Sequence, residues 1–236
     1  MKQRLLIKLS GAALKDKKDG NIFSSNQLTS IAKQIKTLSK TCGIAIVIGG
    51  GNIWRGNMYD KKICREEKAH YMGMIATIIN SMYLCEAFHA QKIPSRVLTL
   101  LPCPNCCQTY TPLLANKCLN NNEVIILAGG TGKPFFSTDT GATKCASEIK
   151  ASTIYMAKDG VDGVYSNDPK TNKRVVRYQT LNMSDCINQK LKFMDTSAMN
   201  MCIKHKIKVV VFNMERPNAI IGGMNKDIPT TIINPK

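Results

Sequence analysis

The sequence predicts an α/β protein built around a mainly parallel β-sheet. Three short apolar runs, over residues 3–9, 44–48 and 124–127, each lead into a glycine-containing turn. Each run is too short for a buried helix and is typical of a central strand. Residues 27–39 carry apolar side chains at the spacing of a one-faced helix. Strand–glycine units of this kind indicate parallel strands whose loops meet at one edge of the sheet.

The other expected elements follow in chain order. A long helix is expected over residues 70–90, where methionine and small residues are typical of a core or a subunit interface. No linker, internal repeat or low-complexity segment interrupts the pattern, so residues 1–236 are expected to form a single domain with one continuous sheet. Short strands are expected at 95–101, 153–157, 208–213 and 230–233, and helices at 113–119, 137–150, 183–190 and 195–206.

The third glycine turn carries the most chemical information. Three glycines within residues 129–132 permit positive φ and a close approach of the backbone to a ligand. Ser137 and Thr138 then begin the expected helix, whose free N–H groups and positive dipole end favour an anion. Asp139 places a carboxylate beside that anion, which makes sense with a cation or an opposing lysine nearby. The stretch favours phosphate chemistry over its alternative, an ordinary strand-to-helix loop with a capping aspartate.

Two basic residues accompany the other glycine turns. Lys8 lies inside the first apolar strand, where a charged side chain needs a partner or a purpose. We expect Lys8 to reach an anion over the carboxyl edge of the sheet, where open α/β sheets bind ligands. The alternative is an edge-strand lysine that faces water. Arg55 follows the second turn, and its forked guanidinium suits a phosphate better than lysine does.

The composition restricts the class of protein. The net charge of +17 attracts polyanions, nucleotides included, but the lysines are dispersed and aromatic residues are few. We therefore expect a lysine-rich solvated surface in preference to a nucleic-acid groove. No apolar run approaches the ~20 residues of a membrane span, and the early first strand leaves no room for a signal peptide. A cytoplasmic protein without a membrane partner is expected.

The ten cysteines are then expected to be reduced thiols. Cys103, Cys106 and Cys107 resemble half of a zinc knuckle, but only Cys118 lies nearby in the sequence and no histidine does. A structural zinc site normally needs a second ligand pair. We interpret these cysteines as small buried or surface residues and expect no zinc site.

Seven motifs run from Lys8 to the strand expected at 208–213. They are K-L-S-G (8–11), I-G-G-G-N-I-W-R-G (48–56), M-G-M-I-A-T-I-I-N (72–80), G-T-G-K-P-F-F-S-T-D (130–139), V-D-G-V-Y-S-N-D-P (161–169), K-F-M-D (192–195) and V-F-N (211–213). In this order and spacing they resemble the bacterial uridylate kinases, or UMP kinases, of the amino-acid-kinase family. The resemblance implies a three-layer α/β/α sandwich of the amino-acid-kinase fold. It also implies that residues up to about 123 form the acceptor (UMP) half with the oligomer interface, and 124–236 the ATP-binding half.

The resemblance implies an enzyme that transfers the γ-phosphoryl group of ATP to UMP to give UDP, in pyrimidine nucleotide biosynthesis. It implies Mg²⁺ carried by the ATP phosphates without metal ligands from the chain, a cytoplasmic homohexamer, and inhibition by UTP. Many family members are activated by GTP through basic residues near the long helix. By this resemblance Arg96 and His89 would be relics of such a pocket, but Cys85 and Glu123 stand where basic residues are often found, which makes GTP a doubtful effector.

The family's functional residues carry over position by position. Lys8, Arg55 and Asp139 would be catalytic: the two cations neutralise charge on the moving phosphoryl group, and Asp139 positions the lysine and the metal–phosphate cluster. No general base is expected, because the phosphate of UMP is already ionised at neutral pH. The ATP-binding residues would be Lys8, Leu9, Ser10, Gly11, Gly51, Arg55, Asp159, Tyr165 and Asp168. The UMP-binding residues would be Gly50, His70, Thr131, Gly132, Lys133, Pro134, Phe135, Phe136, Ser137 and Thr138.

Three positions depart from the family pattern. His70 stands where the family has an aspartate that binds the ribose of UMP, and an imidazole cannot act as a two-oxygen acceptor. We expect weakened UMP affinity or altered UTP inhibition. Lys133 replaces an asparagine and adds positive charge near UMP, and Asp159 stands where asparagine is common at the adenine.

Two alternative functions remain. The first is a kinase of a different small acid, such as carbamate or acetylglutamate, on the same fold. The second is a catalytically weakened nucleotide sensor or a basic nucleic-acid-binding protein, which the +17 charge and His70 would suit.

Overall fold

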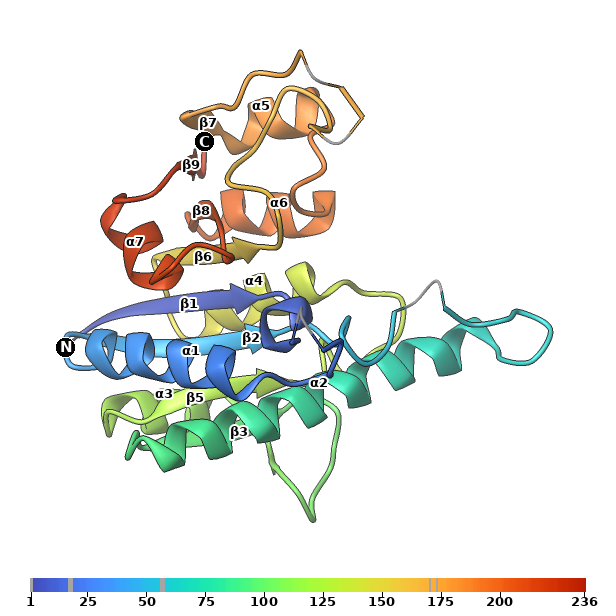
Figure 1. The fold of residues 1–236 in the computed structure, drawn as a ribbon, viewed down its shortest axis with the longest axis vertical. Helices are drawn as coiled ribbons and strands as arrows, with labels where there is room; N and C mark the ends of the chain where they lie inside the picture. The colour runs from blue at the N-terminus through green and yellow to red at the C-terminus, as the bar shows by residue number, and fades with distance from the viewer. Residues whose placement is uncertain (1, 17–18, 56–57, 170, 173) are drawn as a thin grey trace.

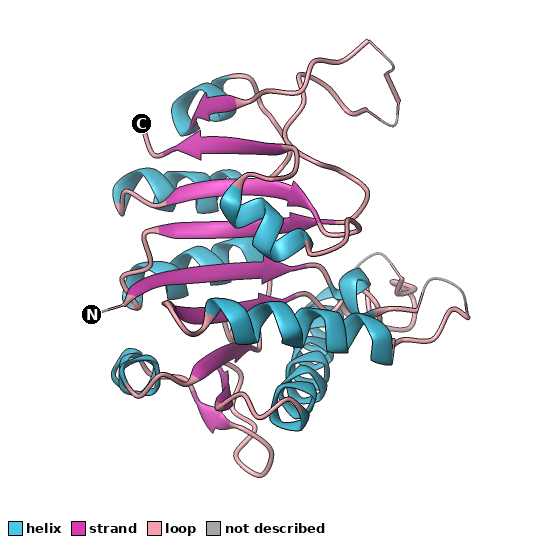
Figure 2. Cartoon of the chain, turned by 60° about the vertical axis from the view of Figure 1, so that its left-hand side comes forward, coloured by secondary structure: helices cyan, strands magenta, loops and turns pink. Residues whose placement is uncertain are grey.

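A nine-stranded sheet runs through the described part of the chain. The computed structural model describes residues 2–16, 19–55, 58–169, 171–172 and 174–236, and Gly56, the last residue of the second motif, lies outside them. The strand order is β4-β3-β5-β2-β1-β6-β8-β9-β7, and Figure 2 shows the strands stacked along the length of the molecule. The described strand pairs are all parallel except β8 with β9. The predicted mainly parallel sheet is confirmed.

The elements have the following bounds. The strands are β1 (Gln3–Leu9), β2 (Cys42–Ile48), β3 (Ser95–Thr99), β4 (Gln108–Thr109), β5 (Val124–Ala128), β6 (Thr153–Lys158), β7 (Thr180–Asn182), β8 (Lys208–Asn213) and β9 (Thr230–Asn234). The helices are the 3₁₀ turn η1 (Gly11–Leu14), α1 (Ser25–Leu38), α2 (Glu66–Ala90), α3 (Pro112–Asn120), α4 (Thr138–Glu148), α5 (Met183–Asn188), α6 (Thr196–Lys204) and α7 (Ala219–Asn225).

Helices cover both faces of the sheet, which gives three layers (Figures 1 and 2). One core cluster joins the sheet to α3, α4, α5 and α6. A second cluster joins the opposite face to α1, α2 and α7. The strands are apolar on both faces because each face is covered, which is the usual state of a parallel sheet. The predicted three-layer sandwich is therefore confirmed.

β1 occupies the centre of the sheet between β2 and β6, and its residues alternate between the two cores. Leu6 packs in the α4 cluster, whereas Ile7 and Leu9 pack in the α1 cluster. Since side chains alternate along a strand, Lys8 lies on the same face as Leu6. The fold thus directs this lysine toward α4.

The carboxyl ends of the central strands lie level with one another. Leu9 is in register with Ile48 of β2 and with Ala157 of β6. Val47 of β2 is in register with Leu127 of β5. The three glycine turns therefore leave the sheet at one edge, as the sequence predicts.

Several elements differ from expectation. The long helix begins at Glu66 and not at residue 70, and the strand expected over 95–101 ends at Thr99. The 3₁₀ turn η1, the short strands β4 and β7, and helix α7 are not predicted by the sequence pattern. β4 lies within a stretch, 102–112, that carried no predicted element.

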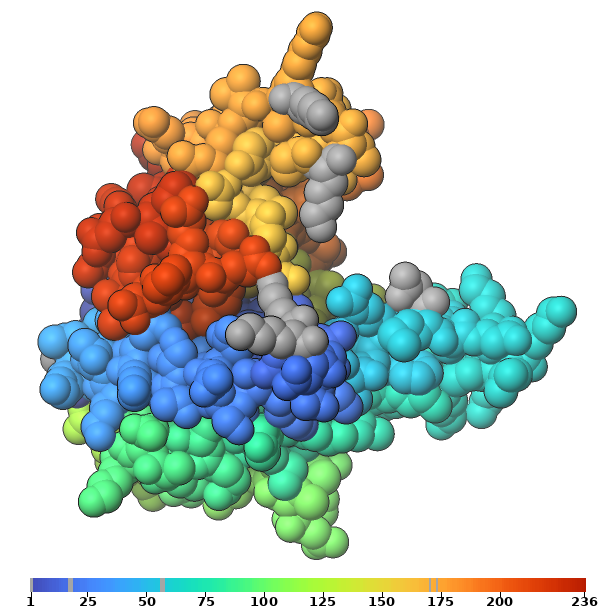
Figure 3. Space-filling model, viewed as in Figure 1, coloured from blue at the N-terminus to red at the C-terminus, as the bar shows by residue number. Residues whose placement is uncertain are grey.

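The outline of the molecule follows the sheet. In Figure 3 the yellow-to-red residues form the upper part and the blue-to-green residues the lower part, and the cyan segment preceding and beginning α2 projects beyond the rest. Among the described helices, none combines the length and the apolar character needed to cross a membrane.

Candidate active site

An ion pair lies where the glycine turns converge. Lys8 Nζ is 2.5 Å from Asp139 Oδ1, and the two side chains are only 16% and 15% exposed. Lys8 comes from the centre of β1 and Asp139 from the first turn of α4, 131 positions later by their residue numbers. The expected meeting of these two residues is confirmed. The alternative of an edge-strand lysine facing water is wrong, because β1 is a central strand.

The N-terminus of α4 is capped in a way that fixes Asp139. Ser137 Oγ accepts hydrogen bonds from the backbone N–H groups of Asp139, at 3.0 Å, and Thr140, at 3.1 Å. A serine at this position satisfies helix N–H groups that would otherwise lack partners. The positive end of the helix dipole consequently lies beside the Lys8–Asp139 pair, which favours a bound anion at this point.

A second lysine, Lys158, reaches the same region from the end of β6. Its Nζ donates a 2.5 Å hydrogen bond to the carbonyl oxygen of Phe193. Burial lowers the pKa of Lys158, the nearby charge of Lys8 lowers it further, and Asp139 partly opposes this effect. Lys158 follows the strand expected at 153–157 and has no predicted role. Its position at the end of an apolar strand, like that of Lys8, was the signal that could have revealed it.

Asp195, the last residue of the K-F-M-D motif, joins α6 to the start of α4. Its carboxylate accepts from the side chains of Ser137 and Thr140, with Thr140 Oγ1 at 3.1 Å, and it caps α6 by accepting from Ala198 N at 2.9 Å. The motif includes this aspartate, but no role is predicted for it from the sequence. The carboxylate fixes the first turn of α4, and with it Asp139, against α6.

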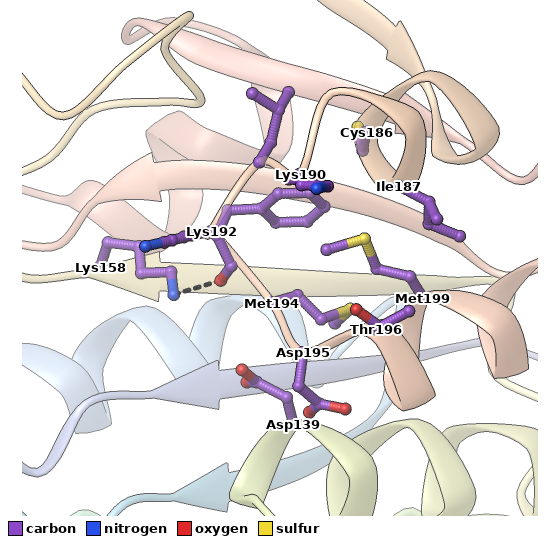
Figure 4. A pocket seen from close by; sticks show the side chains of 12 residues that line it. Asp139, Lys158, Cys186, Ile187, Lys190, Lys192, Met194, Asp195, Thr196 and Met199 are labelled. Atoms are coloured by element: carbon purple, nitrogen blue, oxygen red, sulfur yellow. Dashed lines mark hydrogen bonds between the residues drawn. The ribbon is translucent and has the colours of Figure 1, made fainter.

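A cavity of about 520 Å³ opens beside these charged groups (Figure 4). Asp139 and Asp195 lie at the lower end of the view, and Lys158 lies to one side with its hydrogen bond to the Phe193 carbonyl. Cationic and apolar side chains share the wall, which suits a ligand with an anionic part and a flat apolar part. The lining residues are Asp139, Lys158, Cys186, Ile187, Lys190, Leu191, Lys192, Phe193, Met194, Asp195, Thr196 and Met199.

The first two glycine turns pack directly against each other. A Cβ atom on Gly11 would lie 2.5 Å from Asn52 Oδ1 and 2.6 Å from the Gly49 carbonyl oxygen, so only glycine fits. Arg55, from the second turn, donates from Nε to the Gly51 carbonyl oxygen at 2.9 Å and is otherwise exposed. Ser10 caps η1 through a bond from Ala12 N. The predicted phosphate-binding residues of both turns therefore lie together.

The residues predicted to hold adenosine are only partly brought together. Asp159 and Ser10 line one small cleft. Tyr165 donates from its hydroxyl to Asp162 Oδ1 at 2.6 Å, which raises the pKa of Tyr165. Neither Asp159, Tyr165 nor Asp168 lines the 520 Å³ cavity. Leu9 needs a correction: its side chain is completely buried in the core, so only its backbone can face a ligand.

The residues predicted to bind the acceptor form a loop with an exposed aromatic surface. Phe135 and Phe136 are 62% and 54% exposed, and Phe135 has a left-handed backbone with φ of 68°. His70, from α2, meets Phe135 edge to face with ring centroids 4.8 Å apart. Thr131 closes the loop through its hydroxyl, which donates to the Lys133 carbonyl oxygen at 3.0 Å. His70 and the predicted acceptor loop are thus adjacent.

Two other predicted features lie away from this site. Arg96 forms an ion pair with Glu123 at 2.9 Å and also donates to Gln108, so its guanidinium is engaged within the chain. Cys107 is buried, and burial raises its pKa to about 11. Among the described residues, no group of three or more histidine, cysteine, aspartate or glutamate side chains has a metal-binding arrangement.

Comparisons with known proteins agree with this architecture. A family model described as the amino acid kinase family matches residues 3–213. A uridylate kinase of Mycoplasmopsis pulmonis (strain UAB CTIP) is 40% identical over 237 residues, which covers 99% of this chain and 98% of the relative. A uridylate kinase of Mycoplasma genitalium is 38% identical over 234 residues, with coverage of 99% and 96%.

Solved structures give the same result. The crystal structure of UMP kinase from Ureaplasma parvum matches with a TM-score of 0.94 at 37% identity and covers 99% of both chains. The structure of UMP kinase from Bacillus anthracis matches with a TM-score of 0.91 at 34% identity, covering 99% of this chain and 96% of the other.

Proposed function

The chain belongs to the amino acid kinase family, and we propose that it transfers the γ-phosphoryl group of ATP to UMP, giving ADP and UDP. The observation that carries the proposal is the Lys8–Asp139 ion pair at the junction of the glycine turns. Full-length similarity to uridylate kinases supports UMP as the acceptor. Kinases of other small acids and a catalytically weakened sensor are less well supported.

Charge neutralisation explains how the site would catalyse this reaction. Two polyanions must come into line, and the charge on the phosphoryl group spreads over its oxygens during transfer. Lys8 and Arg55 neutralise that charge together with glycine-turn N–H groups, and Lys158 adds a third cation. Asp139 holds Lys8 in place. The chain therefore acts by positioning and electrostatics, without a general base.

The donor and the acceptor occupy different sides of the Lys8–Asp139 pair. ATP contacts the turn at Ser10 and Gly11, with Gly51, and extends toward Lys158 and the 520 Å³ cavity on the side of residues 124–236. UMP contacts Gly50 and the loop 131–138, with His70 and Phe135 beside its nucleoside. Residues up to about 123 supply Gly50 and His70 to the acceptor side, and the loop 131–138 supplies the rest.

Mg²⁺ enters with the ATP phosphates in this proposal. Magnesium commonly uses one or two carboxylates plus substrate phosphates. Asp139 Oδ1 is paired with Lys8 at 2.5 Å, so Asp139 would position the metal–phosphate cluster through Lys8 and would not need to be a metal ligand. The ion would add positive charge to the phosphates.

Assembly and regulation follow from α2 and the acceptor loop. The exposed side of α2 carries Met72, Ile75, Ile79, Met82 and Tyr83, each 37–49% exposed. An apolar stripe of this kind marks a contact surface. It supports association of copies through α2, which the proposed homohexamer would require. UTP, which shares the nucleoside of UMP, inhibits by occupying the acceptor loop, and the Arg96–Glu123 pair argues against activation by GTP.

The proposed setting is the cytoplasm, in pyrimidine nucleotide biosynthesis. The purified chain is expected to release ADP with UMP in a coupled assay and to form UDP, identified by chromatography. Assays with CMP and dUMP test whether the enzyme discriminates the base and the ribose of the acceptor. Assays with carbamate and acetylglutamate test whether a different small acid is the acceptor. ADP release with carbamate but not UMP would reassign the acceptor. Nucleotide binding without UDP would support the sensor, and salt-sensitive binding of DNA or RNA would support the nucleic-acid function.

A further inference from the structure

Helix α2 contacts the third glycine turn through Thr77. The Thr77 hydroxyl donates to the Met74 carbonyl oxygen at 2.6 Å and accepts from the backbone N–H of Gly129 at 2.9 Å. Its proton is thus committed within the helix, and a lone pair faces Gly129. Thr77 is 5% exposed and Gly129 is buried, so this N–H finds its hydrogen-bond partner inside the protein.

The same helix contacts the second glycine turn one helical turn later, through Asn80. The Asn80 side-chain amide donates to the Gly49 carbonyl oxygen at 2.7 Å and to Asn52 Oδ1 at 2.7 Å. Asn52 returns a bond to Asn80 Oδ1 at 3.0 Å and also donates to the Ile22 carbonyl oxygen. Asn80 is completely buried. This amide pair therefore ties α2 to the Gly49–Asn52 turn.

Backbone packing adds a third contact. A Cβ atom on Gly50 would lie 2.8 Å from Ala76 Cβ and 2.8 Å from the Gly73 carbonyl oxygen. Gly73, Thr77 and Asn80 have the i, i+4, i+7 spacing that places residues on one side of a helix. One side of α2 thus touches the turns that follow both β2 and β5.

We propose that Thr77 and Asn80 are positioning residues that set the spacing between the two glycine turns. This inference rests on the proposed function, in which those turns hold the phosphates that react. In-line transfer needs the donor and acceptor oxygens aligned, and a displacement of ~1 Å can cost ~10²-fold in rate. A helix bonded to both turns fixes that distance, because neither turn can shift without breaking a buried hydrogen bond.

The first test replaces the threonine hydroxyl. Thr77→Val keeps the shape but cannot accept from Gly129 N, and kcat is expected to fall at least ~10-fold, whereas Thr77→Ser retains the hydroxyl and should keep most of the activity. Thr231→Val is the matched control. Thr231 is buried, donates to the Tyr178 carbonyl oxygen at 2.5 Å and accepts from Val164 N at 2.9 Å, so it loses the same pair of bonds elsewhere. Its kcat at saturating ATP should be unchanged.

The second test replaces the asparagine amide. Asn80→Asp removes both donated hydrogen bonds with little change of shape and should lower kcat in the same way. Asn116→Asp is its control, because the Asn116 side-chain amide also donates two hydrogen bonds, to the carbonyl oxygens of Pro112 and Glu148, away from the turns. Since Thr77 and Asn80 act on one distance, the double variant should lose less activity than the product of the single losses.

Hydrogen exchange distinguishes a failure of the positioning role from a failure of the proposed function. Thr77→Val should raise amide exchange in the peptide covering 124–136 in the unliganded chain, and Thr231→Val should not. An unchanged exchange rate there would show that Thr77 does not hold the turn after β5 in place. Raised exchange with kcat and KM within ~2-fold of wild type would overturn the catalytic role while leaving the proposed function intact. A wild-type chain that forms no UDP would instead overturn the proposed function. The exchange result would still show whether Thr77 holds the turn in place.

Discussion

At the scale of single residues, the Lys8–Asp139 pair combines proximity with partial access. The two groups are 2.5 Å apart and each is about 15% exposed, so a ligand phosphate can reach Lys8 while Asp139 holds it. Lys8→Ala and Asp139→Ala are each expected to lower kcat more than ~100-fold, since each removes charge or orientation that matters most during transfer. A coupled ADP assay measures this.

The control for these variants is Lys144→Ala. Lys144 faces Glu148 at 4.0 Å on the surface of α4, the helix that carries Asp139, and an exposed ion pair of this kind contributes little to stability. Circular dichroism should show the wild-type fold for all three variants, because the β1 backbone hydrogen bonds do not use the Lys8 side chain. Turnover near the wild-type rate in Lys8→Ala or Asp139→Ala would show that the pair is not catalytic.

The lowered pKa of Lys158 leads us to expect that kcat depends on pH. Burial and the neighbouring Lys8 lower its pKa, so it loses its proton at a lower pH than an ordinary lysine. If the charged form assists transfer, kcat should decline as the pH rises through that lowered pKa. Lys158→Arg should remove this decline because guanidinium stays charged, whereas Lys158→Met should lower kcat at every pH. The same alkaline profile in Lys158→Arg and wild type would assign the decline to another group.

Local sequence predicts some site residues and not others. Lys8 and Asp139 stand next to glycine turns, so each carries a local signal before its partner is known. The importance of Lys158 and Asp195 depends on distant contacts: Lys158 bonds Phe193, 35 positions away, and Asp195 bonds Ser137, 58 positions away. Neither contact has a periodicity that a sequence pattern can show.

At the scale of elements, Asp195 links the first turns of α4 and α6. Asp195→Ala removes the α6 cap and the acceptor for Ser137 and Thr140, so the free energy of unfolding should fall by about 1–3 kcal/mol. Asp195→Asn keeps a capping side chain and should lose less. Urea unfolding measures both. Equal stability of Asp195→Ala and wild type would mean that the link is not structural.

Element length explains most of what the sequence analysis missed. β4 has two residues and β7 three, too few for a period to be visible. α7 begins after Asn218 in a left-handed conformation and contains two glycines, both unfavourable signals for a helix. Gly223 is needed there because a Cβ would lie 2.7 Å from the Phe212 ring. Long central strands and α1, by contrast, have clear apolar patterns and were predicted.

At the scale of the whole molecule, the sheet order explains why residues remote in sequence form one site. β5, β2, β1 and β6 are neighbours in the sheet although they span residues 3–158, and each ends at the same edge. Parallel pairing in register makes that edge a single surface. The strand–glycine pattern predicts this convergence, but the exact neighbour of each strand depends on tertiary packing.

The exposed side of α2 predicts how copies of the chain associate. The turns are fixed by one side of this helix, and the other side leaves Ile75 and Ile79 49% and 44% exposed. Ile75→Glu combined with Ile79→Glu would bury like charges if copies meet there, at a large desolvation cost. The double variant should therefore elute as a smaller species in size-exclusion chromatography with light scattering, whereas Val176→Glu, at a site 68% exposed away from α2, should not. If assembly through α2 also steadies the turns, the double variant should lose kcat along with its oligomeric state. An unchanged mass would place the subunit contact on another surface.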